Sequence, residues 1–154
     1  MKNIFTLIFV LSIFAGCKNN TAETSKMESK SIEDKLIGEW VALSESENVS
    51  LIFNKTKHAI LIVGKSAIGG ENFTGDDGTK MECKFEVDEN QNPMSLDLVM
   101  YEFGTESEKY RIKGIFRFLT NKKIEYRMSF DGKGLTEFDP NDKQNTAILD
   151  KKDN

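Results

Sequence analysis

The feature that most constrains the fold of this chain is a two-residue alternation of apolar and polar side chains, repeated from Trp40 almost to the C-terminus. Successive side chains of a β-strand point to opposite faces, so such alternation is typical of strands buried on one side. The longest example carries basic residues between its inward positions, which are Tyr110, Ile112, Gly114, Phe116 and Phe118. We expect eight strands, over residues 39–44, 49–53, 58–63, 80–87, 94–100, 109–118, 124–130 and 146–151.

These strands are separated by turn sequences such as Asp76-Asp77-Gly78, and no segment between them is long enough for a helical crossover. Short connections predict an antiparallel sheet, and closing that sheet into an up-and-down barrel buries its apolar face and removes its edges. Eight strands enclose an interior that is either filled by side chains or holds one small ligand. Ser31 and Asp34 predict the N-cap of a short helical turn before the barrel, which we expect to span residues 32–154.

The N-terminus has a different pattern, with Lys2 followed by an apolar run over residues 4–15. Twelve residues reach about 18 Å as a helix, against about 30 Å for the hydrocarbon core of a bilayer. A positive start, a short apolar run and small residues before a polar drop predict a cleaved signal peptide over residues 1–16. The cysteine that follows, Cys17, is either a lipid attachment point or incidental to an ordinary signal peptide.

Phe14-Ala15-Gly16-Cys17 resembles the lipobox of bacterial lipoproteins, which implies that Cys17 carries diacylglycerol and anchors the chain in the lipid bilayer. Residues 17–31 are polar and without periodicity, as expected of a flexible tether. Lys18 rather than Asp follows the cysteine, and in many bacteria with two membranes this implies an outer-membrane lipoprotein facing the periplasm. Cys83 then has no disulfide partner, and its place among alternating apolar residues predicts an inert buried thiol.

A second resemblance concerns the barrel itself. Gly38-Glu39-Trp40, Gly114-Ile115-Phe116, Thr136-Glu137-Phe138 and a basic final strand follow one another as in secreted bacterial proteins with a lipocalin-like domain, over about residues 36–152. The resemblance implies that Trp40 closes the bottom of the barrel beneath Lys151 or Lys152. It also implies a small apolar or amphipathic ligand. Gly114 on an inward face predicts either a sharp bend or a close approach to the backbone.

Several functions are disfavoured by composition. A net charge of −4 and a pI near 5.2 argue against nucleic-acid binding. The single histidine, His58, has no nucleophile or second histidine in a recognisable motif, so we expect no catalytic residue, no metal and no cofactor. Glu137 is the best candidate for a functional carboxylate, with a structural hydrogen bond to backbone as its alternative.

Two classes of function remain for an envelope lipoprotein of this kind. In the first, the barrel binds a small ligand against inward residues of the long strands, for which the candidates are Phe85, Phe116, Tyr126 and Met128, unless these are plain core. In the second, the barrel is filled and its surface contacts another protein, of unknown identity, or the peptidoglycan. Eleven Phe and six Met favour a filled interior, while Gly114 and Ala59 favour a cavity.

Overall fold

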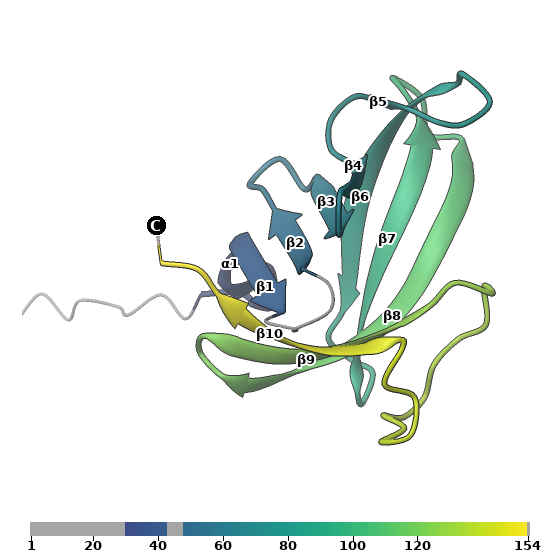
Figure 1. Ribbon diagram of the computed structural model, residues 1–154. Helices are drawn as coiled ribbons and strands as arrows, with labels where there is room; N and C mark the ends of the chain where they lie inside the picture. Colours follow the sequence, from purple (N-terminus) through teal and green to yellow (C-terminus); the bar gives the residue numbers. More distant parts are fainter. Residues whose placement is uncertain (1–29, 43–47, 154) are drawn as a thin grey trace, which may run out of the picture.

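The computed structural model describes residues 30–42 and 48–153, which form one curled antiparallel sheet with a short helix (Figure 1). The predicted signal peptide, Cys17 and all but the last two residues of the predicted tether lie outside the described residues. Within the described part of the chain, no helix is long and apolar enough to cross a membrane.

The helix α1 (Ile32–Leu36) begins where the sequence predicts it. The Ser31 hydroxyl accepts a hydrogen bond of 3.1 Å from the backbone N–H of Asp34, which satisfies one of the free donors of the first turn. Leu36 at the other end is fully buried, so α1 contributes to the barrel core rather than lying free on the surface.

Ten strands follow, and every neighbouring pair in the sheet is antiparallel. Their bounds are β1 (Gly38–Ala42), β2 (Val49–Phe53), β3 (Ala59–Val63), β4 (Ser66–Gly69), β5 (Phe73–Thr74), β6 (Lys80–Asp88), β7 (Met94–Glu102), β8 (Glu108–Thr120), β9 (Lys123–Ser129) and β10 (Thr146–Lys151). Consecutive strands are neighbours except β4 and β5, which form the two ends of the sheet, and β10 returns to pair with β1, which is the up-and-down order.

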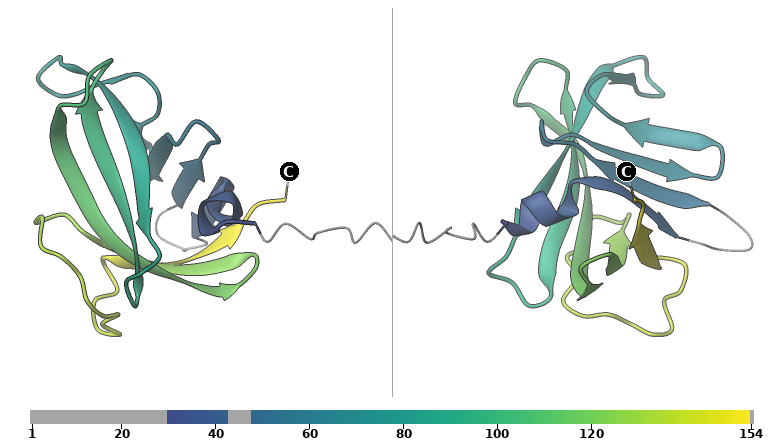
Figure 2. Two further views of the ribbon diagram at one scale, coloured as in Figure 1. Left: turned by 180° about the vertical axis from the view of Figure 1, so that it is seen from behind. Right: turned by 90° about the vertical axis from the view of Figure 1, so that its left-hand side faces the viewer.

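The sheet closes on itself where β6 passes the β3–β4 hairpin, and Figure 2 shows the strands curling round to this seam. The Phe85 N–H donates to the Lys57 carbonyl at 3.0 Å, and the Cys83 N–H donates to the Gly70 carbonyl at 2.9 Å. His58 and Lys84 form an isolated bridge between these two bonds. The predicted antiparallel barrel is therefore confirmed, in a nearly closed form.

The strand count differs slightly from the expected eight because β4 and β5 carry no alternating pattern. β4 reads Ser-Ala-Ile-Gly, and β5 contains only two residues. Gly69 ends β4, and the carbonyl of Gly70 accepts a hydrogen bond at the seam.

The core runs through the middle of the barrel and combines aromatic with aliphatic side chains. Phe53 and Phe85 meet edge to face with ring centroids 4.9 Å apart, and Phe116 meets Phe118 in the same way at 5.6 Å. The largest fully buried side chains are Trp40, Tyr126, Phe53, Phe85 and Phe116. These side chains fill the middle of the barrel.

Candidate functional site: an apolar hollow at the mouth of the barrel

The end of the barrel next to α1 is closed by Trp40. Its indole N–H donates to the Leu36 carbonyl at 2.6 Å, and Lys151 Nζ lies 5.0 Å from the ring centroid. Lys151 Nζ also donates to the Lys35 carbonyl at 2.6 Å, and burial lowers the pKa of this lysine. Of the two lysines expected at this place, Lys151 is confirmed, because Lys152 points instead to Glu39.

Gly38 permits this closure for two reasons. Its φ of 125° is rarely adopted by residues with a side chain. A Cβ at this position would also lie 3.0 Å from Lys151 Cε, so a side chain would press against the lysine stem that covers Trp40. The Gly-x-Trp sequence thus lies at the closed end of the barrel and has a structural role there.

The middle of the barrel holds three of the four residues expected to line a ligand site. Phe85, Phe116 and Tyr126 are buried in the packed core, and none of them lines the hollow described below. The Tyr126 hydroxyl donates to the Leu96 carbonyl at 2.9 Å, and burial raises the pKa of this phenol. The close approach predicted at Gly114 is made by the Tyr126 ring.

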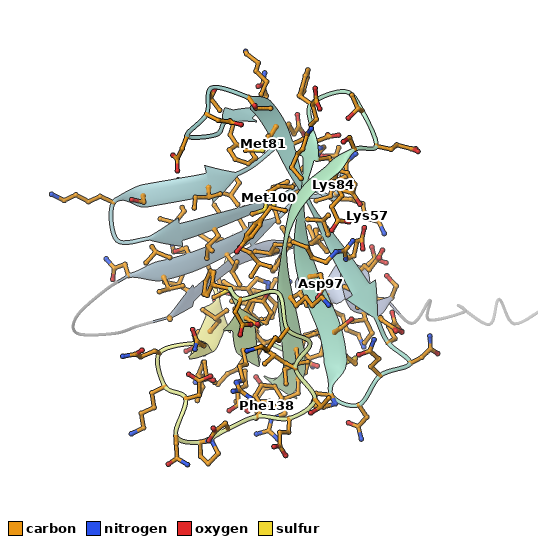
Figure 3. All side chains as sticks on the ribbon, turned by 90° about the vertical axis from the view of Figure 1, so that its right-hand side faces the viewer. Lys57, Met81, Lys84, Asp97, Met100 and Phe138 are labelled. Atoms are coloured by element: carbon orange, nitrogen blue, oxygen red, sulfur yellow. The ribbon has the colours of Figure 1, made fainter. Side chains whose placement is uncertain are left out.

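The opposite end of the barrel is open and contains a hollow of about 680 Å³. Its floor is formed by the buried side chains of Leu61, Met100 and Ile112, with Met81 beside them. Figure 3 shows Met81 and Met100 together near this end of the molecule. The remaining lining comes from β4, from Phe73–Asp76 and from the strand ends at Tyr110 and Phe130.

The rim of this hollow exposes several large apolar side chains. Phe130 is 50% exposed, Tyr110 46% and Ile68 45%, and all three line the hollow. Val63 and Phe103 lie next to it in the adjoining hairpins and are exposed to a similar degree. The open end is thus apolar inside and around part of its edge.

Charged groups lie on one side of the rim. Asp76 lines the hollow, and a shallower depression of about 440 Å³ beside it is bordered by Asp77 and Lys109. Hydrogen bonds from the Thr79 backbone N–H and hydroxyl hold the pKa of Asp77 below its usual range. Lys109 pairs with Glu102 at 2.8 Å, so its charge is already balanced.

The predicted motif Thr136-Glu137-Phe138 lies away from the mouth, in the long loop between β9 and β10. The Glu137 side chain is exposed, and among the described residues it makes no hydrogen bond or ion pair. Its backbone carbonyl accepts from Arg127 at 2.7 Å, and Arg127 also pairs with Asp142 at 2.8 Å. Arg117 stacks 4.6 Å from the centroid of the Phe138 ring. The motif therefore fastens the loop to the barrel wall.

Met128, the fourth expected ligand residue, borders a depression of about 440 Å³ beside this same loop. That depression is separate from the floor of the mouth, although Phe130 borders both. Met128 is itself nearly buried.

His58 lies on the outer surface at the seam. Its Nε2 is 3.0 Å from Glu82 and its Nδ1 is 3.0 Å from the Thr56 hydroxyl. Hydrogen bonds to His58 and Lys84 lower the pKa of Glu82. In the described part of the chain, no group of three or more His, Cys, Asp or Glu side chains is placed to hold a metal ion.

Cys83 is 1% exposed on the inner face of β6, and burial raises the pKa of its thiol to about 12. A thiol with so little thiolate at neutral pH is a poor nucleophile.

The sequence missed the residues of the hollow for an identifiable reason. Much of its wall comes from β4 and β5, which contain four and two residues and are too short to give a clear alternation. The alternation predicts that Tyr110 and Ile112 face inward, but the two-residue period does not report how far along the barrel a residue lies.

Comparison of this chain with protein-family models, with curated proteins and with solved structures finds no match. The resemblances to bacterial lipoproteins and to lipocalin-like proteins therefore stay predictions from the residues that carry them.

Proposed function

We propose that this protein is a lipid-anchored lipoprotein of the cell envelope whose barrel binds a small apolar or amphipathic molecule in its mouth. The observation that supports the proposal is the hollow of about 680 Å³, whose floor is Leu61, Met81, Met100 and Ile112. Pockets for small molecules are usually about 300–1,000 Å³ and mostly apolar, with a few polar groups.

The position of the hollow limits what can bind there. Because the core from Trp40 to Tyr126 is packed, a ligand enters only as far as Met100 and Ile112. Its polar end then stays near the rim, in reach of Asp76 and water. Each methylene buried against the floor contributes about 0.8 kcal/mol, so affinity should rise about fourfold per carbon of an alkyl chain until the hollow is full.

Ligand binding is tested by native mass spectrometry of the protein recovered from the envelope of its own host. A small molecule that is lost on denaturation supports the proposal. A Ser66→Trp variant, which places an indole at the exposed start of β4 beside the hollow, should be recovered without that molecule. Glu89→Trp, in the turn after β6, is the matched control and should keep it. Equal loading of both variants, or repeated recovery of empty wild-type protein, contradicts ligand binding in the mouth.

The anchor is tested separately. The Phe14-Ala15-Gly16-Cys17 pattern supports lipidation of Cys17, and Lys18 supports an outer-membrane location facing the periplasm. A Cys17→Ser variant should fail to incorporate labelled fatty acid and should leave the membrane fraction. A variant that remains membrane-bound contradicts the lipoprotein proposal. The proposed function includes no catalytic step, no cofactor and no nucleic acid.

A second candidate function is protein contact through the rim, because Ile68, Phe103 and Phe130 expose apolar surface there. In this case the rim binds an envelope protein and the hollow stays empty. A photo-crosslinking amino acid at position 103 distinguishes the two. Capture of one protein in intact cells, together with empty hollows in native mass spectra, favours contact over ligand binding.

A further inference from the structure

The wall of the hollow combines one carboxylate with three aromatic rings. Asp76 is the only charged side chain among the described residues that line it, and the rings belong to Phe73, Tyr110 and Phe130. The Tyr110 hydroxyl donates to the Phe130 carbonyl at 2.9 Å, which ties the two aromatic residues of the rim together. The floor beneath them is aliphatic or thioether.

This combination favours positive charge at the rim. Aromatic faces attract ammonium groups through their quadrupole, and alkylated ammonium groups are the usual ligands of sites with several rings. A carboxylate at the same rim adds Coulomb attraction for a cation and repels an anion.

Two of the cations near the rim are paired with carboxylates. Lys109 pairs with Glu102, and Lys133 pairs with Asp131 at 2.9 Å. Arg111, one residue beyond Tyr110, lies in an outer-face cluster with Glu86, Asp97 and Glu108. Lys65 beside Ser66 and Lys80 beside Met81 make no ion pair within the described residues, but neither of these lysines lines the hollow, whereas Asp76 does.

We propose that the ligand is a cationic amphiphile, with an alkylated ammonium head between Asp76 and the rings of Phe73, Tyr110 and Phe130 and an apolar tail on the floor of the hollow. This inference rests on the proposed function, because it names the class of molecule that the mouth binds. The charged rim places the head of the ligand, and the apolar floor places its tail.

The test compares three probes of equal chain length and different head charge. Dodecyltrimethylammonium is cationic, N,N-dimethyldodecylamine N-oxide is neutral with a head of similar size, and dodecanoate is anionic. Binding to residues 17–154 with Cys17→Ser, which retain every described residue, is measured by calorimetry at pH 8 below the micelle concentration of each probe. We expect the cation to bind at least about tenfold more tightly than dodecanoate, with the neutral probe between them.

Two variants assign the preference to the rim. Asp76→Asn should reduce the ratio of cation to anion affinity about three- to fivefold, and Phe130→Leu should weaken the cation about two- to fivefold while changing the N-oxide less. Glu89→Gln removes the same charge in a distant turn, and Phe138→Leu makes the same change at the far end of the barrel (Figure 3). Both controls should bind like the parent protein.

Each outcome decides a different point. Equal binding of all three probes, or tightest binding of dodecanoate, overturns the cationic head and leaves ligand binding in place. A preference that Asp76→Asn and Phe130→Leu do not change also overturns it, because the net negative charge of the whole protein would then explain the attraction. Failure of all three probes to bind contradicts the proposed function itself.

Discussion

The ring of Tyr126 occupies the space that a side chain at Gly114 would need. A Cβ built on Gly114 lies 2.5 Å from Tyr126 Cε2 and 2.7 Å from the Leu96 carbonyl oxygen, which accepts the Tyr126 hydroxyl. The absence of a side chain in the middle of β8 thus lets a tyrosine of β9 reach across to β7 inside the barrel. The space that a glycine leaves on an inward face is filled by the protein and is not part of a ligand cavity.

Gly114→Ala should therefore destabilise the barrel by about 1–3 kcal/mol, because neither the ring nor the Leu96 carbonyl can move without disturbing β7. Urea unfolding monitored by circular dichroism measures the change. Gly134→Ala is the control, since a Cβ there meets nothing within 4 Å. It should be neutral or slightly stabilising. Equal midpoints for the two variants would show that Tyr126 relaxes freely.

Lys151 is expected to stabilise the closed end through Trp40. Lys151→Met keeps most of the stem but removes the cation above the indole and the hydrogen bond to Lys35, which should cost about 1–2 kcal/mol and change the emission of the single tryptophan. Lys152→Met removes an exposed pair with Glu39 and should cost less than about 1 kcal/mol. A larger loss from the Lys152 change would contradict the role of Lys151.

The seam should weaken in acid because of Glu82. Its pKa lies below the ordinary value of 4.5, since His58 and Lys84 hydrogen-bond to the ionised carboxylate. A carboxyl group with a lowered pKa in the folded state contributes stability above its unfolded pKa, and that stability is lost as the pH falls through the folded pKa. Stability measured from pH 7 to pH 3 should thus fall less steeply in Glu82→Gln than in the parent protein.

Glu89→Gln serves as the control for this titration because Glu89 lies in the turn after β6, away from the seam. The stability of Glu89→Gln should fall between pH 7 and pH 3 as steeply as that of the parent protein. If the stability of Glu82→Gln falls just as steeply, then the His58–Glu82 contact does not stabilise closure of the barrel.

The fold could be predicted largely from the two-residue alternation of apolar and polar side chains. One face of each long strand is buried, and the alternation indicates which residues lie on that face. β4 and β5 were not predicted because they contain only four and two residues, too few to show an alternation, and they are ordered by pairing with β3 and β6. The helix cap at Ser31 and the Trp40–Lys151 contact depend on short-range chemistry and on a known motif, so they too were accessible.

The site was less accessible than the fold. Phe85, Phe116 and Tyr126 face inward as expected. They lie midway along the barrel, where they are buried in the core and fill the interior. Depth is set by strand tilt and by register shifts such as the one between Met100 and Tyr101, and neither leaves a mark in the sequence. Residues with the same alternation thus belong either to the core or to the wall of the hollow, depending on how far along the barrel axis they lie.

The loop between β9 and β10 should depend on Arg127. This residue is the side chain that joins the Glu137 carbonyl and the Asp142 carboxylate to the barrel wall, and hydrogen bonding to it lowers the pKa of Asp142. Arg127→Met leaves that carboxylate without its cation and frees the loop. Because exposed, mobile loops are cut first, a lysine-specific protease should cleave at Lys133 or Lys143 several-fold faster in this variant. Arg117→Met, which loses the stacking on Phe138 but keeps both Arg127 contacts, should show a smaller increase. Equal cleavage rates in parent and Arg127→Met would mean that other contacts hold the loop, and the Thr-Glu-Phe motif would lose its structural explanation.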